Sequence, residues 1–174
     1  MISDLNILEK SDKEYIENVI LNYDFPYFLS KSQVDGDDSP FFSHNVLERP
    51  EDRKPGKTYN SSTGPFFQKL LERFCKKKNI ELKEFLRCCI NISFHLKSKK
   101  SKLHVDHEYE HKQIILYLND ADGDTVLVHD DKNGVSGTTS IKPQKYKMVC
   151  FDNIPHYINY PTNGYRAVVV FTFR

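Results

Sequence analysis

The spacing of apolar residues changes from a helical period to a period of two near residue 90, and this change restricts the fold more than any other feature of the chain. Before it, Pro65, a residue type favoured in the first turn of a helix, precedes one helical stripe of apolar residues: Phe66, Phe67, Leu70, Leu71 and Phe74. After it, Ile90, Ile92, Phe94 and Leu96 alternate with polar residues, which is typical of a half-buried strand. The sequence therefore predicts a helix that ends near Lys78, followed by a β-rich region.

Further strand candidates follow, separated by turn-rich segments such as NDADGD, DDKNGVSG and PTNG. They are residues 103–106, 113–118, 125–129 and 146–151, and the pair of strands around Tyr157 and Val168. An earlier helix, capped by Ser11 or Asp12, carries Tyr15, Ile16, Val19 and Ile20 at helical spacing. Helices followed by several short strands predict an α+β, mainly β fold, with N-terminal helices packed on one sheet of an antiparallel β-sandwich or jelly roll.

The segment 28–64 is rich in Ser, Asp, Pro and Gly, with apolar islands at Phe41-Phe42 and Val46-Leu47. We expect short strands and an active-site loop there, because long structureless loops are uncommon in compact domains. Its aromatic residues Phe41, Phe42 and Tyr59 are candidates for lining a peptide groove. The chain of 174 residues predicts one domain, 1–174, in which 1–80 give helical and loop support and 81–174 form the jelly-roll core.

Charge and cysteine content exclude several classes of protein. The 25 basic and 24 acidic residues nearly cancel, so no large field indicates a nucleic-acid or membrane partner, although a local basic patch stays open. The N-terminus is not signal-like and no long apolar stretch occurs, so we expect a non-exported protein without membrane segments. The four cysteines form no Cys-x-x-Cys pair, which indicates reduced thiols in a cytoplasm. Nothing indicates the oligomeric state.

The stretch HVDHEYEH, residues 104–111, contains two overlapping metal motifs. His107-Glu108-x-x-His111 is the motif of zinc hydrolases, and it requires a helix to bring both histidines to one face. The strand-like run QIILYL follows directly, and Glu110 is the last glutamate of the chain, so the usual carboxylate ligand is absent. The extended histidine version would need Gly and His where Ile114 and Tyr117 stand. An aspartate ligand, Asp122 or Asp124, stays open.

The other motif, His104-x-Asp106, needs only a strand, because residues two apart point to the same face. A third ligand has to come from another strand, and His156 in DNIPHYINYP is placed to supply it. Two histidines and one carboxylate leave coordination positions open, the arrangement that suits Fe(II) oxygen chemistry. Arg166 opens the last strand, where a buried cation could bind a dicarboxylate through two parallel hydrogen bonds.

Several segments in order resemble a known family. They are His104-x-Asp106, the strand IILYLN with Tyr117, Gly123-Asp-Thr125, Ile141-Lys-Pro143 leading to Val149-Cys-Phe151, then His156 and Gly164-x-Arg166. Together they resemble the double-stranded β-helix core of Fe(II)/2-oxoglutarate dioxygenases, and most of all the prolyl 4-hydroxylase-like group with its small bacteriophage-encoded members. The resemblance covers residues 80–174 firmly and the N-terminal helices loosely.

The resemblance implies roles for five residues. His104, Asp106 and His156 would bind Fe(II), Arg166 would pair with the distal carboxylate of 2-oxoglutarate, and the hydroxyl of Tyr117 would assist. With O2 as the other cosubstrate, the implied reaction hydroxylates an unactivated C–H bond, on a prolyl or other side chain of a peptide or protein. The implied location is the cytoplasm, that of the host if a phage encodes the chain.

Two alternatives stay open beside this hypothesis: a non-catalytic jelly-roll binding module, and a zinc hydrolase that uses His107-Glu108-x-x-His111. Nucleobase or small-molecule hydroxylation is also compatible with the sequence. If these residues have structural roles only, Tyr117 packs in the core and His107 and His111 are solvent-facing or loop residues. His95 and His129 are then strand histidines whose ring nitrogens have hydrogen-bond partners. The lysines of KSKKSK at 97–102 are then a solvated turn; alternatively they form a rim patch for an acidic or phosphate-bearing substrate.

The last two strands set a geometric condition. If Tyr160 paired with Tyr165 across the loop PTNG, Arg166 would point to the face opposite His156. We therefore expect an odd loop or a bulge, so that Tyr160 opposes Arg166 and both functional side chains point inward.

Overall fold

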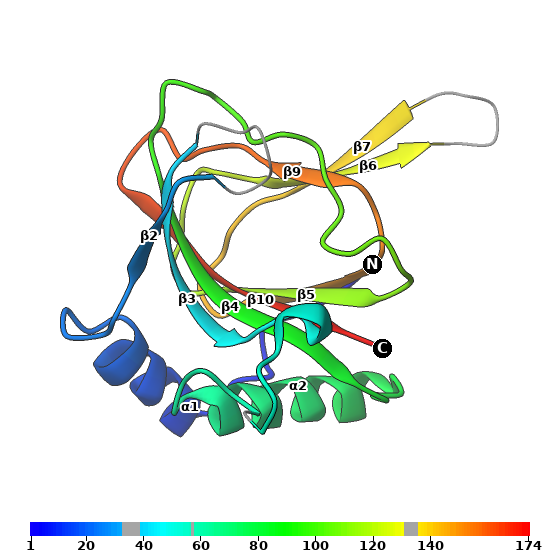
Figure 1. Ribbon diagram of the computed structural model, residues 1–174. Helices are drawn as coiled ribbons and strands as arrows, with labels where there is room; N and C mark the ends of the chain where they lie inside the picture. The colour runs from blue at the N-terminus through cyan, green and yellow to red at the C-terminus, as the bar shows by residue number, and fades with distance from the viewer. Residues whose placement is uncertain (33–38, 57, 131–135) are drawn as a thin grey trace.

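In the computed structural model, which describes residues 1–32, 39–56, 58–130 and 136–174, two antiparallel sheets face each other (Figure 1). The large sheet of the described chain has the order β1 (Ile2–Asp4), β8 (Met148–Asp152), β5 (Lys112–Tyr117), β10 (Tyr165–Phe173), β4 (Phe85–Phe94), β3 (Phe41–Leu47) and β2 (Phe28–Ser30). The small sheet has the order β7 (Ser136–Ile141), β6 (Thr125–Asp130) and β9 (His156–Ile158). The predicted mainly β jelly roll is confirmed.

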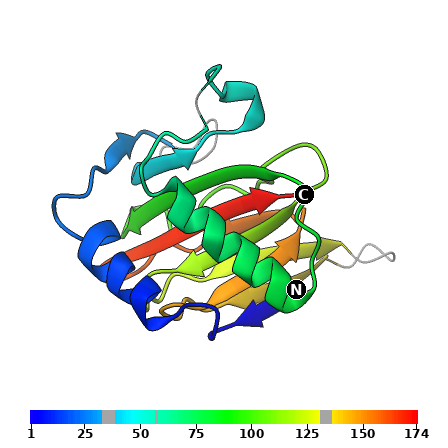
Figure 2. The same ribbon diagram turned by 90° about the horizontal axis from the view of Figure 1, so that it is seen from below.

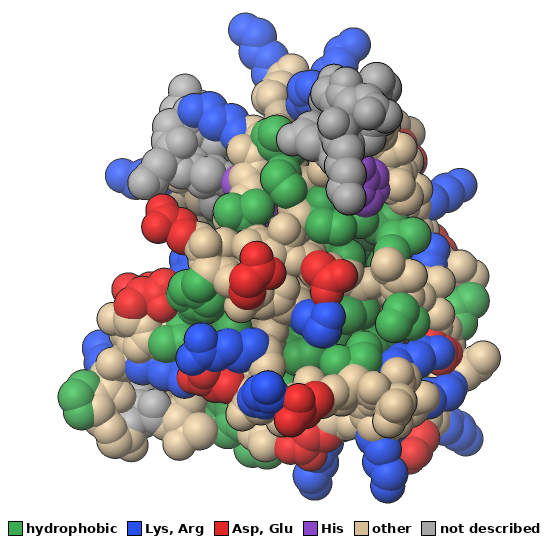
Figure 3. All heavy atoms as spheres, turned by 90° about the vertical axis from the view of Figure 1, so that its right-hand side faces the viewer, with side chains coloured by type: hydrophobic (Ala, Val, Ile, Leu, Met, Phe, Trp, Pro, Cys, Tyr) green, Lys and Arg blue, Asp and Glu red, His purple; other side chains and the backbone are tan. Residues whose placement is uncertain are grey.

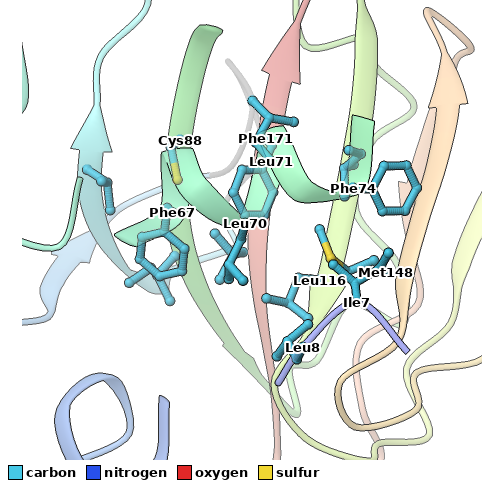
Figure 4. Packing of buried hydrophobic residues seen from close by; sticks show 14 of the residues in the cluster. Ile7, Leu8, Phe67, Leu70, Leu71, Phe74, Cys88, Leu116, Met148 and Phe171 are labelled. Atoms are coloured by element: carbon cyan, nitrogen blue, oxygen red, sulfur yellow. The ribbon is translucent and has the colours of Figure 1, made fainter. Parts of the chain in front are cut away.

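Two helices cover the outer face of the large sheet. They are α1 (Lys10–Tyr15), which continues as the π-helical turn η1 (Ile16–Ile20), and α2 (Gly64–Lys78), which lies across the strands in Figure 2. Phe67, Leu70, Leu71 and Phe74 are fully buried, and they pack on residues such as Leu116 and Phe171 of the sheet (Figure 4). Asn79 ends α2 in the left-handed conformation, a common helix stop. The predicted packing of N-terminal helices on one sheet is confirmed.

The first helix differs from its prediction in two details. It is capped by Glu9 rather than by Ser11 or Asp12, and the Asp12 carboxylate instead accepts the Glu9 amide at 2.8 Å from the third helical position. Val19, expected on the buried stripe, is 37% exposed, while Ile16 and Ile20 are fully buried. The π-turn explains this, because its wider winding, seen in the Leu21 N–H bond to the Ile16 carbonyl, moves Val19 out of the stripe.

The strands also differ from the prediction in places. Strands β2 and β3 supply the short strands expected in 28–64, but β1 and β7 were not predicted. β7 was missed because part of its segment was interpreted as the turn DDKNGVSG, of which residues 131–135 lie outside the described chain. Residues 103–106 are not a regular strand: single bridges join Lys100 to Asn159 and His104 to His156. Residues 100–104 therefore run beside β9 as an irregular extension of the small sheet.

The surface charges and the cysteines are arranged as the composition led us to expect. Basic and acidic side chains are interspersed on the face shown in Figure 3. The four cysteines are unpaired and buried, and burial raises the pKa of Cys75 to about 11 and that of Cys150 to about 12. Among the described residues, no helix has the length and apolar character needed to cross a bilayer.

The packing of α2 predicts the effect of a truncation. Leu70→Ala removes a fully buried side chain between helix and sheet, and we expect it to lower the free energy of unfolding by about 2–5 kcal/mol. Urea unfolding followed by circular dichroism measures this loss. Lys69→Ala, at the exposed neighbouring position of the same helix, is the control and should change the value by less than about 0.5 kcal/mol. An equal loss in both variants would contradict the packing described.

Candidate functional site

A cavity of about 300 Å³ lies between the two sheets, and the inward face of the large sheet forms its floor. On this face, Arg166 of β10 is in register with Ser93 of β4. Thr172 lies six residues after Arg166 on β10, and it is in register with Arg87 of β4 and Gln113 of β5. The floor therefore has an Arg166 end and an Arg87 end, separated along the strands by roughly 20 Å between backbone positions.

His104, Asp106 and His156 meet at this cavity. His104 and His156 exchange backbone hydrogen bonds at 3.0 and 2.9 Å, and their rings lie 4.6 Å apart between centroids. Asp106 follows in a bend, with Oδ2 3.7 Å from Nε2 of His156. The three side chains that the sequence suggested as ligands thus come from two neighbouring segments and face one space.

The hydrogen bonds of both histidines fix which nitrogen holds the proton. Nδ1 of His104 lies 3.0 Å from the carbonyl oxygen of Lys102, and Nδ1 of His156 lies 2.9 Å from that of Ile154. Because a carbonyl only accepts, each Nδ1 donates its proton, and Nε2 is the nitrogen that remains for a metal. A backbone carbonyl that accepts from Nδ1 is typical of histidines that bind a metal through Nε2.

Charges in the site suit a divalent cation. Burial lowers the pKa of His156, which keeps its imidazole neutral. Burial alone would raise the pKa of Asp106, but the neighbouring groups, with Arg87 contributing most, together outweigh burial and hold that pKa below the usual range. Two imidazoles whose Nδ1 is bound to a carbonyl and one ionised carboxylate therefore fit an Fe(II) site. As the side chains stand, no closed cluster of three ligands exists among the described residues, and one carboxylate oxygen of Asp106 is bound by Arg87.

Two arginines beside Asp106 were missed by the sequence analysis. Arg87 donates from Nη1 to Oδ1 of Asp106 at 2.8 Å, and the two side chains are 18% and 9% exposed. Arg49 donates from Nη2 to the backbone carbonyl of Asp106 at 3.3 Å. A signal for Arg87 existed, because extending the alternation of residues 90–96 backwards places position 87 on the same face as Asn91 and Ser93.

Arg166 lies at the other end of the floor and is 2% exposed. It donates from Nη2 to the hydroxyl of Thr125 at 2.7 Å, and that hydroxyl is 2.8 Å from the hydroxyl of Tyr117. Its guanidinium carbon lies 5.5 Å from the centre of the Tyr117 ring. Nε of Arg166 is buried without a hydrogen-bond partner in the described part of the chain. These contacts leave a buried cation with hydroxyl and ring neighbours and an unused donor.

Tyr117 is fully buried and does not line the cavity itself. Burial raises the pKa of its phenol, so the hydroxyl stays protonated and able to donate. Its contacts are with Thr125 and Arg166, and it thus supports the cation from behind.

The expected hairpin between Tyr160 and Arg166 is wrong. β9 belongs to the small sheet and β10 to the large one, so the two strands do not pair, and Arg166 pairs with Ser93 instead. The connection 159–164 crosses from one sheet to the other. His156 and Arg166 therefore face the same cavity from opposite sheets, which meets the geometric condition without a bulge.

His107 and His111 were interpreted as solvent-facing or loop residues; they do lie in a loop, but the solvent-facing alternative is wrong. They are 5% and 4% exposed, with rings 4.8 Å apart, and Nε2 of His107 lies 2.8 Å from the hydroxyl of Thr172. Burial lowers the pKa of His107 to about 4. Residues 107–111 form a loop rather than a helix, and Glu108 is exposed. The zinc-hydrolase motif thus lacks the helix that its geometry requires.

Other candidates take ordinary positions. His129 lies in β6 with Nε2 3.0 Å from the hydroxyl of Thr139, as expected of a satisfied strand histidine, whereas His95 is exposed just beyond β4. The lysines at 97, 99, 100 and 102 are exposed, as in a solvated turn. Of the three aromatic candidates, Phe41 lines the cavity and Tyr59 packs against α2 at Gly64. The ring of Phe42 lies 5.9 Å from that of Phe94 between centroids, on the outer face of the large sheet.

Comparisons with known proteins complement this geometry. No family model and no curated protein matches the chain. Solved structures do match. An oxidoreductase of the 2OG-Fe(II) oxygenase family from Burkholderia pseudomallei is 16% identical with a TM-score of 0.72, and the match covers 96% of this chain and 80% of that one.

Two prolyl hydroxylase structures are similar as well. The prolyl-4-hydroxylase of Pseudomonas putida is 14% identical with a TM-score of 0.61, over 99% of this chain and 91% of that one. The prolyl hydroxylase of Trichoplax adhaerens, in complex with a peptide fragment of the oxygen degradation domain of hypoxia inducible factor, is 16% identical with a TM-score of 0.62, over 99% and 82%. The likeness to bacteriophage-encoded members stays a prediction. At these identities the comparisons show the fold, and the chain adopts the fold of the 2OG-Fe(II) oxygenases that its sequence resembles.

Proposed function

We propose that the chain is an Fe(II)- and 2-oxoglutarate-dependent dioxygenase that hydroxylates an unactivated C–H bond, on a prolyl or other side chain of a peptide or protein. One observation carries the proposal: two histidines with Nδ1 bound to carbonyls, an ionised aspartate and a buried arginine with an unused donor face one cavity. The prolyl hydroxylases of the same fold support the substrate class.

His104, Asp106 and His156 are the residues that would hold the iron, through Nε2 of each imidazole and a carboxylate oxygen. The chemistry supplied by bound Fe(II), with O2 and 2-oxoglutarate, is conversion of C–H to C–OH coupled to decarboxylation of 2-oxoglutarate to succinate. The chain's own contribution is to hold Nδ1 of both imidazoles on backbone carbonyls, so that Nε2 faces the metal, and to keep Asp106 ionised.

Arg166 is the anchor for the distal carboxylate of 2-oxoglutarate in this proposal. A guanidinium binds a carboxylate through parallel hydrogen bonds, and burial strengthens such a pair because little water competes. Tyr117 and Thr125 hold the guanidinium in place from behind. The location of Arg166 at the floor end remote from Arg87 leaves the cavity between them for the cosubstrate.

Substitution of the ligands tests the metal assignment. Under anaerobic conditions, addition of Fe(II) and 2-oxoglutarate to the wild-type protein should produce a weak metal-to-ligand charge-transfer band. His104→Ala and Asp106→Ala each remove a ligand and should abolish it, whereas His95→Ala, at an exposed histidine outside the cavity, should leave it unchanged. A band that survives in both ligand variants would disprove the assignment.

Substitution of Arg166 and Tyr117 tests the cosubstrate site. Arg166→Gln removes a charged partner, and we expect 2-oxoglutarate to bind about 10- to 150-fold more weakly. Tyr117→Phe removes only a supporting hydroxyl, and a loss of about 2- to 10-fold is expected. Titration of the absorption band measures both. Unchanged affinity in Arg166→Gln, together with no succinate formation in the wild-type protein, would favour the non-catalytic jelly-roll module instead.

Arg87 should act on the metal through Asp106. Arg87→Met leaves the buried carboxylate without its cation, which should destabilise the metal-free protein by about 3–5 kcal/mol. Loss of this orienting contact should also weaken metal binding by about 10- to 100-fold. Thermal unfolding and Mn(II) titration measure the two effects. Arg87→Lys keeps the charge and should lose less of both; equal losses in the two variants would show that charge is not the cause.

A further inference from the structure

Arg49 is the cation of the cavity that the proposed function does not use. It lies just after β3, at the residue that precedes the short 3-10 turn η2 (Pro50–Asp52), and it lines the cavity. Arg87 is paired with Asp106, and Arg166 is assigned to 2-oxoglutarate. Arg49 has no carboxylate partner among the described residues, and its one hydrogen bond there, to the Asp106 carbonyl at 3.3 Å, leaves most of its five donors unused.

The charges around the cavity leave a positive surplus. Among the described residues, three with a guanidinium group and one with a carboxylate line it, so the positive charges outnumber the negative ones even when the histidines add none. Adding Fe(II) and the 2-oxoglutarate dianion does not change the surplus, because their charges cancel. Arg49 and Arg87 are partly buried and Arg166 is 2% exposed, and burial of positive charge without a counter-charge is costly. A negatively charged group on the remaining ligand, the substrate, would relieve it.

The position of Arg49 separates it from the cosubstrate. Arg49 and Arg87 both contact Asp106, at the floor end where Arg87 is in register with Thr172. Arg166 lies six residues away along β10. A ligand held on Arg166 therefore does not account for Arg49. Phe41 and Val105 also line the cavity and give apolar surface for the rest of a substrate.

We propose that Arg49 is a specificity-determining residue that binds a carboxylate of the substrate near the C–H bond to be oxidised. The inference rests on the proposed function and names the substrate class of the same site: an acid. The carboxylate has two sources, an acidic side chain beside the reacting residue of a peptide, or the free carboxylate of a small acid. A guanidinium at this position recognises both in the same way.

Matched pairs of probes test the inference. One pair is a capped prolyl peptide with Glu or with Gln beside the proline; the other is N-acetylproline and its amide. Each is given to the Fe(II)- and 2-oxoglutarate-loaded protein, and both binding and the mass gain of one oxygen are measured. We expect the wild-type protein to favour the acidic member of at least one pair by about tenfold or more. The pair that shows the preference identifies the source of the carboxylate.

Variants of Arg49 connect the preference to the residue. Arg49→Gln should bring the acid-to-neutral ratio close to one by raising KM for the acidic probe rather than by lowering kcat, and Arg49→Lys should retain part of the ratio. Lys97→Gln removes an exposed charge outside the cavity and should keep the wild-type ratio. A merely structural brace of the Asp106 loop would instead affect acidic and neutral probes alike.

The outcomes separate this inference from the proposed function. If the charge-transfer band forms but the wild-type protein prefers the acidic member of neither pair, the role of Arg49 is wrong and the oxygenase assignment stands. A wild-type protein that responds to none of the probes counts as showing no preference. If Arg49→Gln keeps the wild-type preference, the role is equally wrong. Absence of the band from the wild-type protein overturns the proposed function itself.

Discussion

The alternation of side chains across β5, β10 and β4 is the constraint on which both the core and the site depend. On β10, Ala167, Val169, Phe171 and Phe173 face the helices. On the other face, Arg166, Val168 and Val170 line the cavity, and Thr172 contacts His107. The registers with β4 and β5 fix this division across three strands. A slip of one residue would place Arg166 in the apolar core and Phe171 in the cavity, so the packing of α2 and the chemistry of the site are secured together.

The sequence predicted this arrangement where its pattern is regular and failed where both faces are apolar or where partners lie far apart. Residues 90–96 alternate clearly, so that strand and the helix before it were predicted, and spacing with the family resemblance led to His104, Asp106 and His156. The run RAVVVFTF is apolar on both faces, so its partners cannot be read from it locally. The hairpin was consequently expected between strands that lie in opposite sheets.

Polar residues with distant partners were the other source of error. His107 is buried because Thr172, 65 positions away, supplies its hydrogen bond. Arg87 and Arg49 carry no motif, and their importance follows only from their contacts with Asp106. The role of a side chain beside a candidate metal ligand depends on its tertiary contacts. The candidate ligands themselves were recognisable from their spacing in the sequence. This difference explains why the ligand candidates were found and Arg87 and Arg49 were not.

The buried charges that line the cavity cost free energy, and a bound ligand of opposite charge would lower this cost. Burial of Arg166 costs solvation free energy, and its unused Nε adds the cost of an unmade hydrogen bond. A module that only keeps a jelly-roll scaffold would gain stability by replacing such a residue with an apolar one. The retained cation instead favours a site shaped for an anion, and the two carbonyl-bound histidines beside it favour a metal in the same space. Together these costs are explained by a site that binds both, which is what the oxygenase fold would require of its inward face.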